Sequence, residues 1–256
     1  MGFVAILKKE LKSYFYSPIA YVVITMFLIL NGYFFFGMML SFAEYGRMAL
    51  ENNPEAKINI NDGVIRQLFG NMSFVMLLIL PVLTMRLFSE EKKSGTFELI
   101  TTYPIKDLDL VIGKILSATA VLLLMVGLTS FYCVFMYSYS QPDTGRILTG
   151  YLGTILMGIA FISMGTFISA LTESQIISAI VTFGILLIFW VLGWVGTFSS
   201  AEGTIAEVFK QLSMLNHFES FGKGIIDLSD VVYFISFITL SIFLTLRALE
   251  SKKWRS

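Results

Sequence analysis

The side chains that could do chemistry are concentrated in one polar stretch, MRLFSEEKKSGTFELITTYPI (residues 85–105), which lies between two long apolar segments. Gly95 allows a sharp change of chain direction, and Thr96 can cap a new helix with its hydroxyl. Glu98 then falls in the first turn, where the helix dipole favours a negative charge. Pro104 disfavours continuation of the helix. The pattern predicts a short helix lying along the membrane face. The apolar side of this helix consists of Phe97, Leu99 and Ile100.

Elsewhere the sequence carries no set of residues suited to catalysis. The one histidine, His217, has no nearby cysteine, histidine and carboxylate set for a metal site. No Ser–His pair or paired intramembrane aspartate indicates a protease, and the phosphate-binding pattern G-x-x-x-x-G-K-[ST] is absent. The one cysteine, Cys133, cannot form a disulfide within the chain. We therefore expect a protein that is not an enzyme and that holds no cofactor or metal of its own.

The composition indicates an integral membrane protein. Of 256 residues, 56% are hydrophobic and 14% are charged, whereas about a quarter of the residues in a soluble domain are charged. The formal net charge is zero, which gives no bias toward nucleic acid. Because unpaired backbone groups are costly in lipid and no alternating strand pattern appears, we expect an all-α fold of six transmembrane helices, forming one domain over residues 1–256. The expected spans are 18–42, 67–87, 108–139, 147–171, 174–198 and 229–249.

The distribution of lysine and arginine predicts the orientation in the membrane. Six spans place both termini on one side, and that side carries twice as many basic residues as the other. The positive-inside rule therefore places both termini and the polar stretch in the cytoplasm. The basic residues expected inside are Lys8, Lys9, Lys12, Arg86, Lys92, Lys93, Lys106, Lys114, Arg247, Lys252, Lys253 and Arg255, and those expected outside are Arg47, Lys57, Arg66, Arg146, Lys210 and Lys223.

The expected spans contain almost no ionisable side chains. Lys114 lies near the cytoplasmic end of the third span, where its ammonium could reach the interface. Glu173 lies in the tight turn between the fourth and fifth spans. Ion-driven carriers normally need charged residues along their path, so this composition argues against such a carrier. Recurring glycines in the fourth and fifth spans predict close helix packing.

The segment FVAILKKELKSYFYSP before the first span is amphipathic. It predicts an N-terminal helix lying in the interface with its basic residues toward lipid headgroups. Such a helix is either a membrane anchor or a lateral helix that frames the docking site of a partner. Its apolar residues at helical spacing are Phe3, Ile6, Leu7, Leu11, Tyr14 and Phe15.

The polar stretch resembles the signature of type-2 ATP-binding-cassette (ABC-2) permeases, in which F-x-x-E is followed by G-T-x-E-x-L/I and P-[IV]. The matching residues are Phe88, Glu91, Gly95, Thr96, Glu98, Ile100, Pro104 and Ile105. The six-span order, the N-terminal helix and the expected cytoplasmic termini agree with that family, so the resemblance covers essentially the whole chain. Within the family, KKELKSYFYSPIAY and LNHFESFGKGIIDLSDVVYF are most similar to gliding-motility-associated and copper-enzyme-maturation permeases.

The resemblance implies how the chain works. In that family, the segment between spans two and three forms a coupling helix that fits a groove on a P-loop ATPase subunit, which binds ATP and Mg. The candidate polar contacts to the ATPase are Glu91 and Glu98, and Phe97 is the candidate apolar anchor. A six-span chain provides half of the pathway, so the resemblance implies a second permease chain, identical or related, in the cytoplasmic (inner) membrane.

Residues 199–228, on the expected outer side, also carry a helical apolar stripe. In the resembling family, short helices here dip into the outer leaflet and help to close the exit, so a lid and simple membrane-surface packing are both open. The candidate outer gate consists of Leu215, His217, Phe218 and Glu219. The other outer loop, residues 43–66, is predicted to be an exposed linker that could contact an extracytoplasmic partner.

We therefore expect a permease subunit that exports a substrate with ATP hydrolysed by another chain. The alternative is a structural membrane subunit that anchors a motility or assembly complex, because no polar pathway is evident in the spans. An autonomous channel or carrier would work without any ATPase. The sequence does not identify the substrate.

Overall fold

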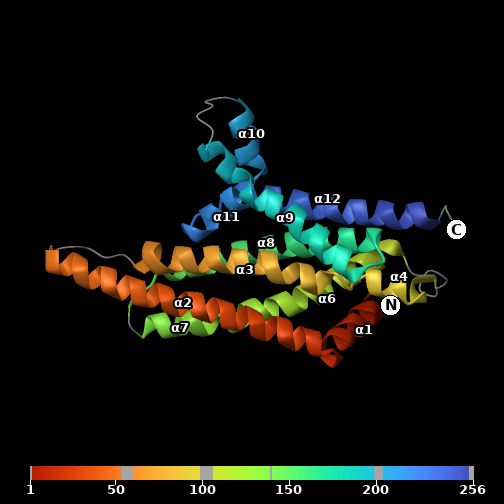
Figure 1. Ribbon diagram of the computed structural model, residues 1–256, viewed down its shortest axis with the longest axis horizontal. Helices are drawn as coiled ribbons and strands as arrows, with labels where there is room; N and C mark the ends of the chain where they lie inside the picture. Colours follow the sequence, from red (N-terminus) through yellow and green to blue (C-terminus); the bar gives the residue numbers. More distant parts are fainter. Residues whose placement is uncertain (1, 53–59, 99–105, 139, 199–203, 254–256) are drawn as a thin grey trace.

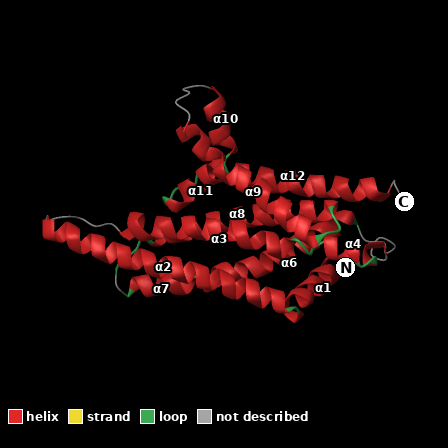
Figure 2. Ribbon diagram, viewed as in Figure 1, coloured by secondary structure: helices red, strands yellow, loops and turns green. Residues whose placement is uncertain are grey.

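The computed structural model describes residues 2–52, 60–98, 106–138, 140–198 and 204–253. Within these ranges the chain consists of helices joined by turns and short loops, without strands, which confirms the expected all-α fold (Figure 2). Six helical segments within them are long and apolar enough to cross a membrane, as predicted. They cover Pro18–Asn52, Asn61–Lys93, Asp107–Tyr137, Thr144–Leu171, Gln175–Gly193 and Leu228–Ser251.

The helices form one elongated bundle (Figure 1). One end, called the α1 end below, carries α1 (Gly2–Tyr16), α4 (Ser89–Lys93) and the C-terminal part of α12 (Leu228–Lys253). The opposite end carries the C-terminal part of α2 (Pro18–Asn52), the π-helix η1 (Asn61–Ile65) and the first turns of α3 (Arg66–Thr84) and α8 (Thr144–Leu171). The remaining helices are α6 (Asp107–Leu128), α7 (Ser130–Tyr137), α9 (Gln175–Phe198), α10 (Thr204–Leu212) and α11 (Met214–Gly222).

The first span is longer than the sequence predicted, since α2 continues to Asn52 instead of ending near Phe42. The expected linker over residues 43–66 is therefore helical at its start, and it is helical again in η1 at its end. The continuation FAEYGRMALEN is rich in good helix formers, which explains why the helix does not stop where the apolar run does. At about 1.5 Å per residue, a helix of this length exceeds the ~30 Å hydrocarbon core.

The third span, predicted as one helix over residues 108–139, is instead divided into α6 and α7 at Thr129. The Thr129 hydroxyl donates to the carbonyl of Val126 at 2.6 Å and lies 3.2 Å from the hydroxyl of Tyr151. A side-chain hydroxyl that competes for a backbone carbonyl favours a bend or break in a helix. The break therefore has a local cause that the hydropathy profile cannot reveal.

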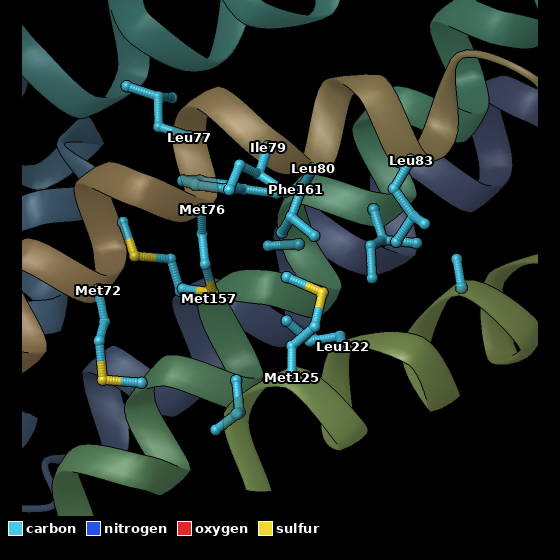
Figure 3. Packing of buried hydrophobic residues seen from close by; sticks show 14 of the residues in the cluster. Met72, Met76, Leu77, Ile79, Leu80, Leu83, Leu122, Met125, Met157 and Phe161 are labelled. Carbon is cyan, nitrogen blue, oxygen red and sulfur yellow. The ribbon is translucent and has the colours of Figure 1, made fainter. Parts of the chain in front are cut away.

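The centre of the bundle is α8, which packs against α3, α6, α9, α11 and α12. Figure 3 shows the core between α3, α6 and α8, where methionine and leucine side chains such as Met76, Met157 and Leu122 interdigitate. Glycines let the neighbouring helices approach α8 closely, which confirms the predicted close packing for the fourth span, whereas Gly184 of the fifth span has no such neighbour. The glycine–neighbour pairs are Gly150 with Phe69, Gly153 with Phe221, Gly158 with Leu122 and Gly165 with Thr84.

We predict that Gly165→Ala destabilises the protein, whereas Gly184→Ala does not. A Cβ atom at position 165 would lie 2.7 Å from Cβ of Thr84, a buried β-branched residue. A Cβ atom at position 184 would meet nothing within 4 Å. Overpacking typically costs about 1–3 kcal/mol, so thermal unfolding in detergent should shift to lower temperature for Gly165→Ala alone. Equal unfolding temperatures for the two variants would contradict the packing of α3 against α8.

Candidate functional site

In the middle of the polar stretch, after α4, a turn at Ser94 and Gly95 leads into a helical segment. Gly95 has a φ of +70°, a left-handed conformation that suits glycine. Thr96, Phe97 and Glu98 are helical. We expected Thr96 to cap this helix, but it is already helical, and its hydroxyl donates back to the Glu91 carbonyl at 3.3 Å. Ile100 and Pro104, the remaining predicted site residues of this stretch, lie outside the described residues.

Within this segment the side chains differ in exposure. Thr96 and Glu98 are exposed, whereas Phe97 is half-buried and meets the ring of Phe88 edge-on at 6.3 Å between centroids. Phe88 itself is fully buried. The segment thus presents polar groups outward while two aromatic rings attach it to the bundle.

The short helix α4, which precedes this turn, is held by α8. The chain leaves its helical path after Thr84, so the first N–H groups of the next helix have no partner in their own helix. Ser169 of α8 supplies one, because its hydroxyl accepts from the N–H groups of Phe88 and Ser89 at 3.0 and 3.1 Å. It also donates to the Met85 carbonyl at 3.0 Å. One side chain of α8 therefore stabilises the break between α3 and α4.

A second contact joins the C-terminal end of α4 to the same C-terminal end of α8. The Lys92 ammonium donates to the carbonyl of Ala170, close to the C-terminus of α8. A cation is favoured there because the unpaired carbonyls give a helix C-terminus partial negative charge. α4 and α8 are thus fixed to each other at two points.

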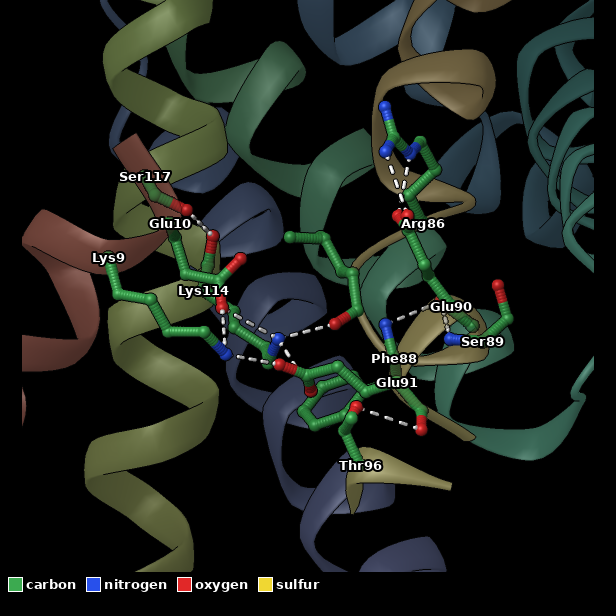
Figure 4. Close-up of polar contacts among 12 residues, drawn as sticks. Lys9, Glu10, Arg86, Phe88, Ser89, Glu90, Glu91, Thr96, Lys114 and Ser117 are labelled. Carbon is green, nitrogen blue, oxygen red and sulfur yellow. Dashed lines mark hydrogen bonds and ion pairs between the residues drawn. The ribbon is translucent and has the colours of Figure 1, made fainter. Parts of the chain in front are cut away.

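Four charged side chains form a closed ring where α1, α4 and α6 meet (Figure 4). Lys114 lies on α6, and its side chain is only 1% exposed. The Lys114 ammonium lies 3.0 Å from a carboxylate oxygen of Glu10. It lies 2.9 Å from Oε2 of Glu91, and this second contact is an ion pair without the geometry of a hydrogen bond. The ammonium of Lys9 lies 2.7 Å from Glu91 Oε1 and 3.5 Å from Glu10 Oε1. Each cation therefore contacts both anions.

This ring gives a buried cation the partners that it needs. Burying an ammonium without partners would cost much free energy. The Lys114 ammonium is surrounded by two carboxylates, by the Leu87 carbonyl at 2.5 Å and by the face of the Phe88 ring, whose centroid is 5.0 Å away. Burial lowers the pKa of Lys9, but its hydrogen bond to Glu91 and the charges of Glu91 and Glu10 outweigh burial, so this pKa is raised. The ring is electrically balanced and ties three helices together.

The ring changes the interpretation of several sequence features. Lys114, expected to reach the membrane interface, instead points into the bundle because its partners lie there. α1 packs against α6, with Ile6, Glu10 and Tyr14 buried, and the Tyr14 hydroxyl donates to the Leu83 carbonyl at 3.1 Å. The predicted contact of Glu91 with an ATPase stays a prediction, although its carboxylate is already occupied within the chain.

At the opposite end, the structure places the four candidate gate residues on α11. Phe218 is buried and Leu215 is half-buried. Glu219 pairs with Arg66 of α3 and with Lys223. His217 binds Asp230 and the Gln211 carbonyl. These residues are therefore engaged within the chain, and the gate assignment itself stays a prediction.

Sequence reasoning missed Lys9, Glu10 and Ser169 as parts of the site. A faint signal existed for Glu10, because it is the one acidic residue in a basic helix and lies on the side of Ile6 and Tyr14. Ser169 carried no signal beyond its being a small residue in a span. Its role depends on where α8 lies relative to the break between α3 and α4.

We predict that Lys114→Met destabilises the protein much more than Lys12→Met, a matched change at an exposed lysine of α1. Removing one partner of a buried ion pair typically costs about 3–5 kcal/mol because the other charges remain buried. Adding Glu91→Gln to Lys114→Met should restore part of the loss, because Lys9 and Glu10 then form a balanced pair. Thermal unfolding in detergent measures all three variants. If Lys114→Met unfolds like Lys12→Met, the ring does not hold the three helices.

A comparison with known families places this geometry in context. Residues 28–249 match the family described as ABC-2 family transporter protein, from within α2 to within α12. A search of curated proteins found no match. Because the family match spans most of the 256 residues and the six helical segments, the chain belongs to the ABC-2 transporter family, as a membrane-spanning permease component.

Proposed function

We propose that this chain is the transmembrane permease subunit of an ABC exporter, driven by ATP hydrolysis in separate P-loop ATPase subunits that hold ATP and Mg. The α1 end and both termini then face the cytoplasm, in agreement with the excess of basic residues there. The substrate leaves at the opposite end, across the cytoplasmic membrane.

The observation that carries the proposal is the attachment of the exposed segment Thr96–Glu98 to a fixed helix. This segment follows α4, which is bound to α8 through Ser169 and Lys92 and to α1 and α6 through the charged ring. A protein that pushed on the segment would therefore move several helices together. ATP could drive such a movement only if the contact energy differs between the states of the ATPase, as it does when two ATPase subunits close.

The surface beside α4 offers room for the same partner. An open groove of about 400 Å³ lies between α4 and the turn from α8 to α9. Its lining combines both signs of charge with one apolar side chain: Lys93, Glu173, Ser174, Gln175 and Ile176. We propose that the ATPase contacts this groove together with Phe97 and Glu98.

The proposal includes a second permease chain, identical or related. One face of α9 exposes Ile176, Ile180 and Ile188, and α2 exposes large apolar side chains along its length. Such faces suit lipid or a partner helix. The proposal also keeps the narrower likeness to gliding-motility-associated and copper-enzyme-maturation permeases and an extracytoplasmic partner for residues 43–66.

We predict that a P-loop ATPase copurifies with the tagged chain in mild detergent and that Glu98→Arg abolishes this. The change reverses the charge of an exposed side chain in the proposed contact, so the fold should survive. Lys12→Glu, a charge reversal elsewhere at the α1 end, is the control and should retain the ATPase. Phe97→Asp tests the apolar anchor, with thermal unfolding to show that the variant is folded. Retention of the ATPase by folded Glu98→Arg would refute the assigned contact.

A second readout separates an exporter from a structural anchor. The ATPase rate of the purified complex in liposomes should change when lipid, glycan or peptide substrates are added, because an exporter couples the two events. A complex with constant ATPase activity across such a panel would favour the anchor of a motility or assembly machine.

A further inference from the structure

The C-terminus of α10 is closed by three side chains from other segments. The last carbonyls of a helix have no partner in that helix and need donors from elsewhere. Here Asn216 donates to the Lys210 carbonyl at 3.1 Å, and the Tyr233 hydroxyl donates to the Leu212 carbonyl at 2.7 Å. Between them, Nε2 of His217 lies 2.8 Å from the Gln211 carbonyl. Three successive carbonyls of α10 are thereby bound to α11 and α12.

The His217 ring joins α10 to α12 through both of its nitrogens. Nδ1 lies 2.6 Å from the buried carboxylate of Asp230, and the ring stacks on Tyr233 with 4.0 Å between centroids. A backbone carbonyl can only accept a hydrogen bond, and so can an ionised carboxylate. Both contacts therefore require two hydrogens shared by the imidazole and the carboxylate. Loss of one hydrogen leaves two lone pairs facing each other at one of the two contacts.

We infer that His217 is a positioning residue that holds α10 against α12, and that it does so only while the His217–Asp230 pair carries two hydrogens. The inference rests on the proposed function only in treating the end of the bundle that carries α10 and α11 as the exit side. The contact itself is independent of any ATPase.

The charged and titratable groups near the His217 imidazole come from the α11–α12 connection, α10, α11 and α12. Asp227, in the connection between α11 and α12, accepts from the Ser229 N–H at 3.0 Å, and this hydrogen bond lowers its pKa, so it stays negative. Glu219 of α11 is balanced by Arg66 and Lys223.

The charged side chains of α10 are Glu207 and Lys210. On α12, the titratable groups nearest the His217 imidazole are Asp230 and Tyr233. From Gln175 to Gly193, α9 contributes no charged residue.

Apart from the cap, α10 packs mainly against α9 and only slightly against α11. It projects from the bundle (Figure 1), and from Glu207 to Leu212 only Phe209 is partly buried. Val208 is 47% exposed, although it is apolar. The described contacts of α10 are with α9 and α11, in addition to the carbonyl cap. Loss of the His217 bond would therefore loosen the exposed C-terminal half of α10, which the Asn216 and Tyr233 bonds then hold alone on this side.

The test is a nitroxide spin label on Val208→Cys, in full-length protein that carries Cys133→Ser and is reconstituted in liposomes. Electron paramagnetic resonance reports the mobility of the label between about pH 5 and pH 9, a range in which histidine titrates in proteins. We expect the immobilised spectral component to be lost as the pH rises. With His217→Gln, which carries the same charge at every pH, the spectrum should not change across the range.

Tyr233→Phe is the matched control, because it removes a cap bond that does not titrate in this range. It should loosen the label at every pH and leave the pH response in place. A pH-independent spectrum of the parent, or an unchanged response with His217→Gln, would overturn the inference. ATPase copurification is expected to be normal with His217→Gln, so failure of this inference and failure of the proposed coupling are separate results.

Discussion

The burial of the Lys114 ammonium is the constraint on which the α1 end depends. A cation removed from water needs several oxygen partners, and these come from three different elements: Glu10 of α1, Glu91 of α4 and the Leu87 carbonyl in the turn between α3 and α4. That carbonyl is available because the chain has left its helical path there. The break in the second span therefore exposes an acceptor that the buried lysine uses.

α8 connects this end of the bundle with the other. Near its C-terminus, Ser169 and the Ala170 carbonyl hold α4. Near its N-terminus, the Thr149 hydroxyl donates to the Phe221 carbonyl at 3.0 Å, and Gly153 accommodates the Phe221 ring. Glycines between these points bring α3 and α6 close. Because a tightly packed helix moves as a unit rather than by bending, both ends of the molecule are attached to the same rigid element.

The sequence predicted the parts of this structure that depend on local chemistry. Six apolar runs predicted the six spans, and Gly95 predicted the sharp turn that its positive φ provides. The sequence ended the second span at residue 87, close to the end of α3 at Thr84. The break at Thr129 was not predicted, since hydropathy averages over a hydroxyl that competes for a backbone carbonyl. The ring was missed because its members are 104 and 82 residues apart along the chain, so only the packing of α1 on α6 brings them together. Lys9 and Glu10 also precede residue 28, where the family match begins.

The two ends of the molecule solve the same problem with different donors. Each has a helix terminus whose backbone groups need partners, and each finds them on neighbouring helices. At the α1 end the buried donor is an ammonium, which keeps its N–H groups between two carboxylates. At the opposite end the donor is the half-buried imidazole of His217, which serves two acceptors only with a second hydrogen. In the proposed exporter, an ammonium would hold the end on which the ATPase acts, and an imidazole would hold α10 at the proposed exit side.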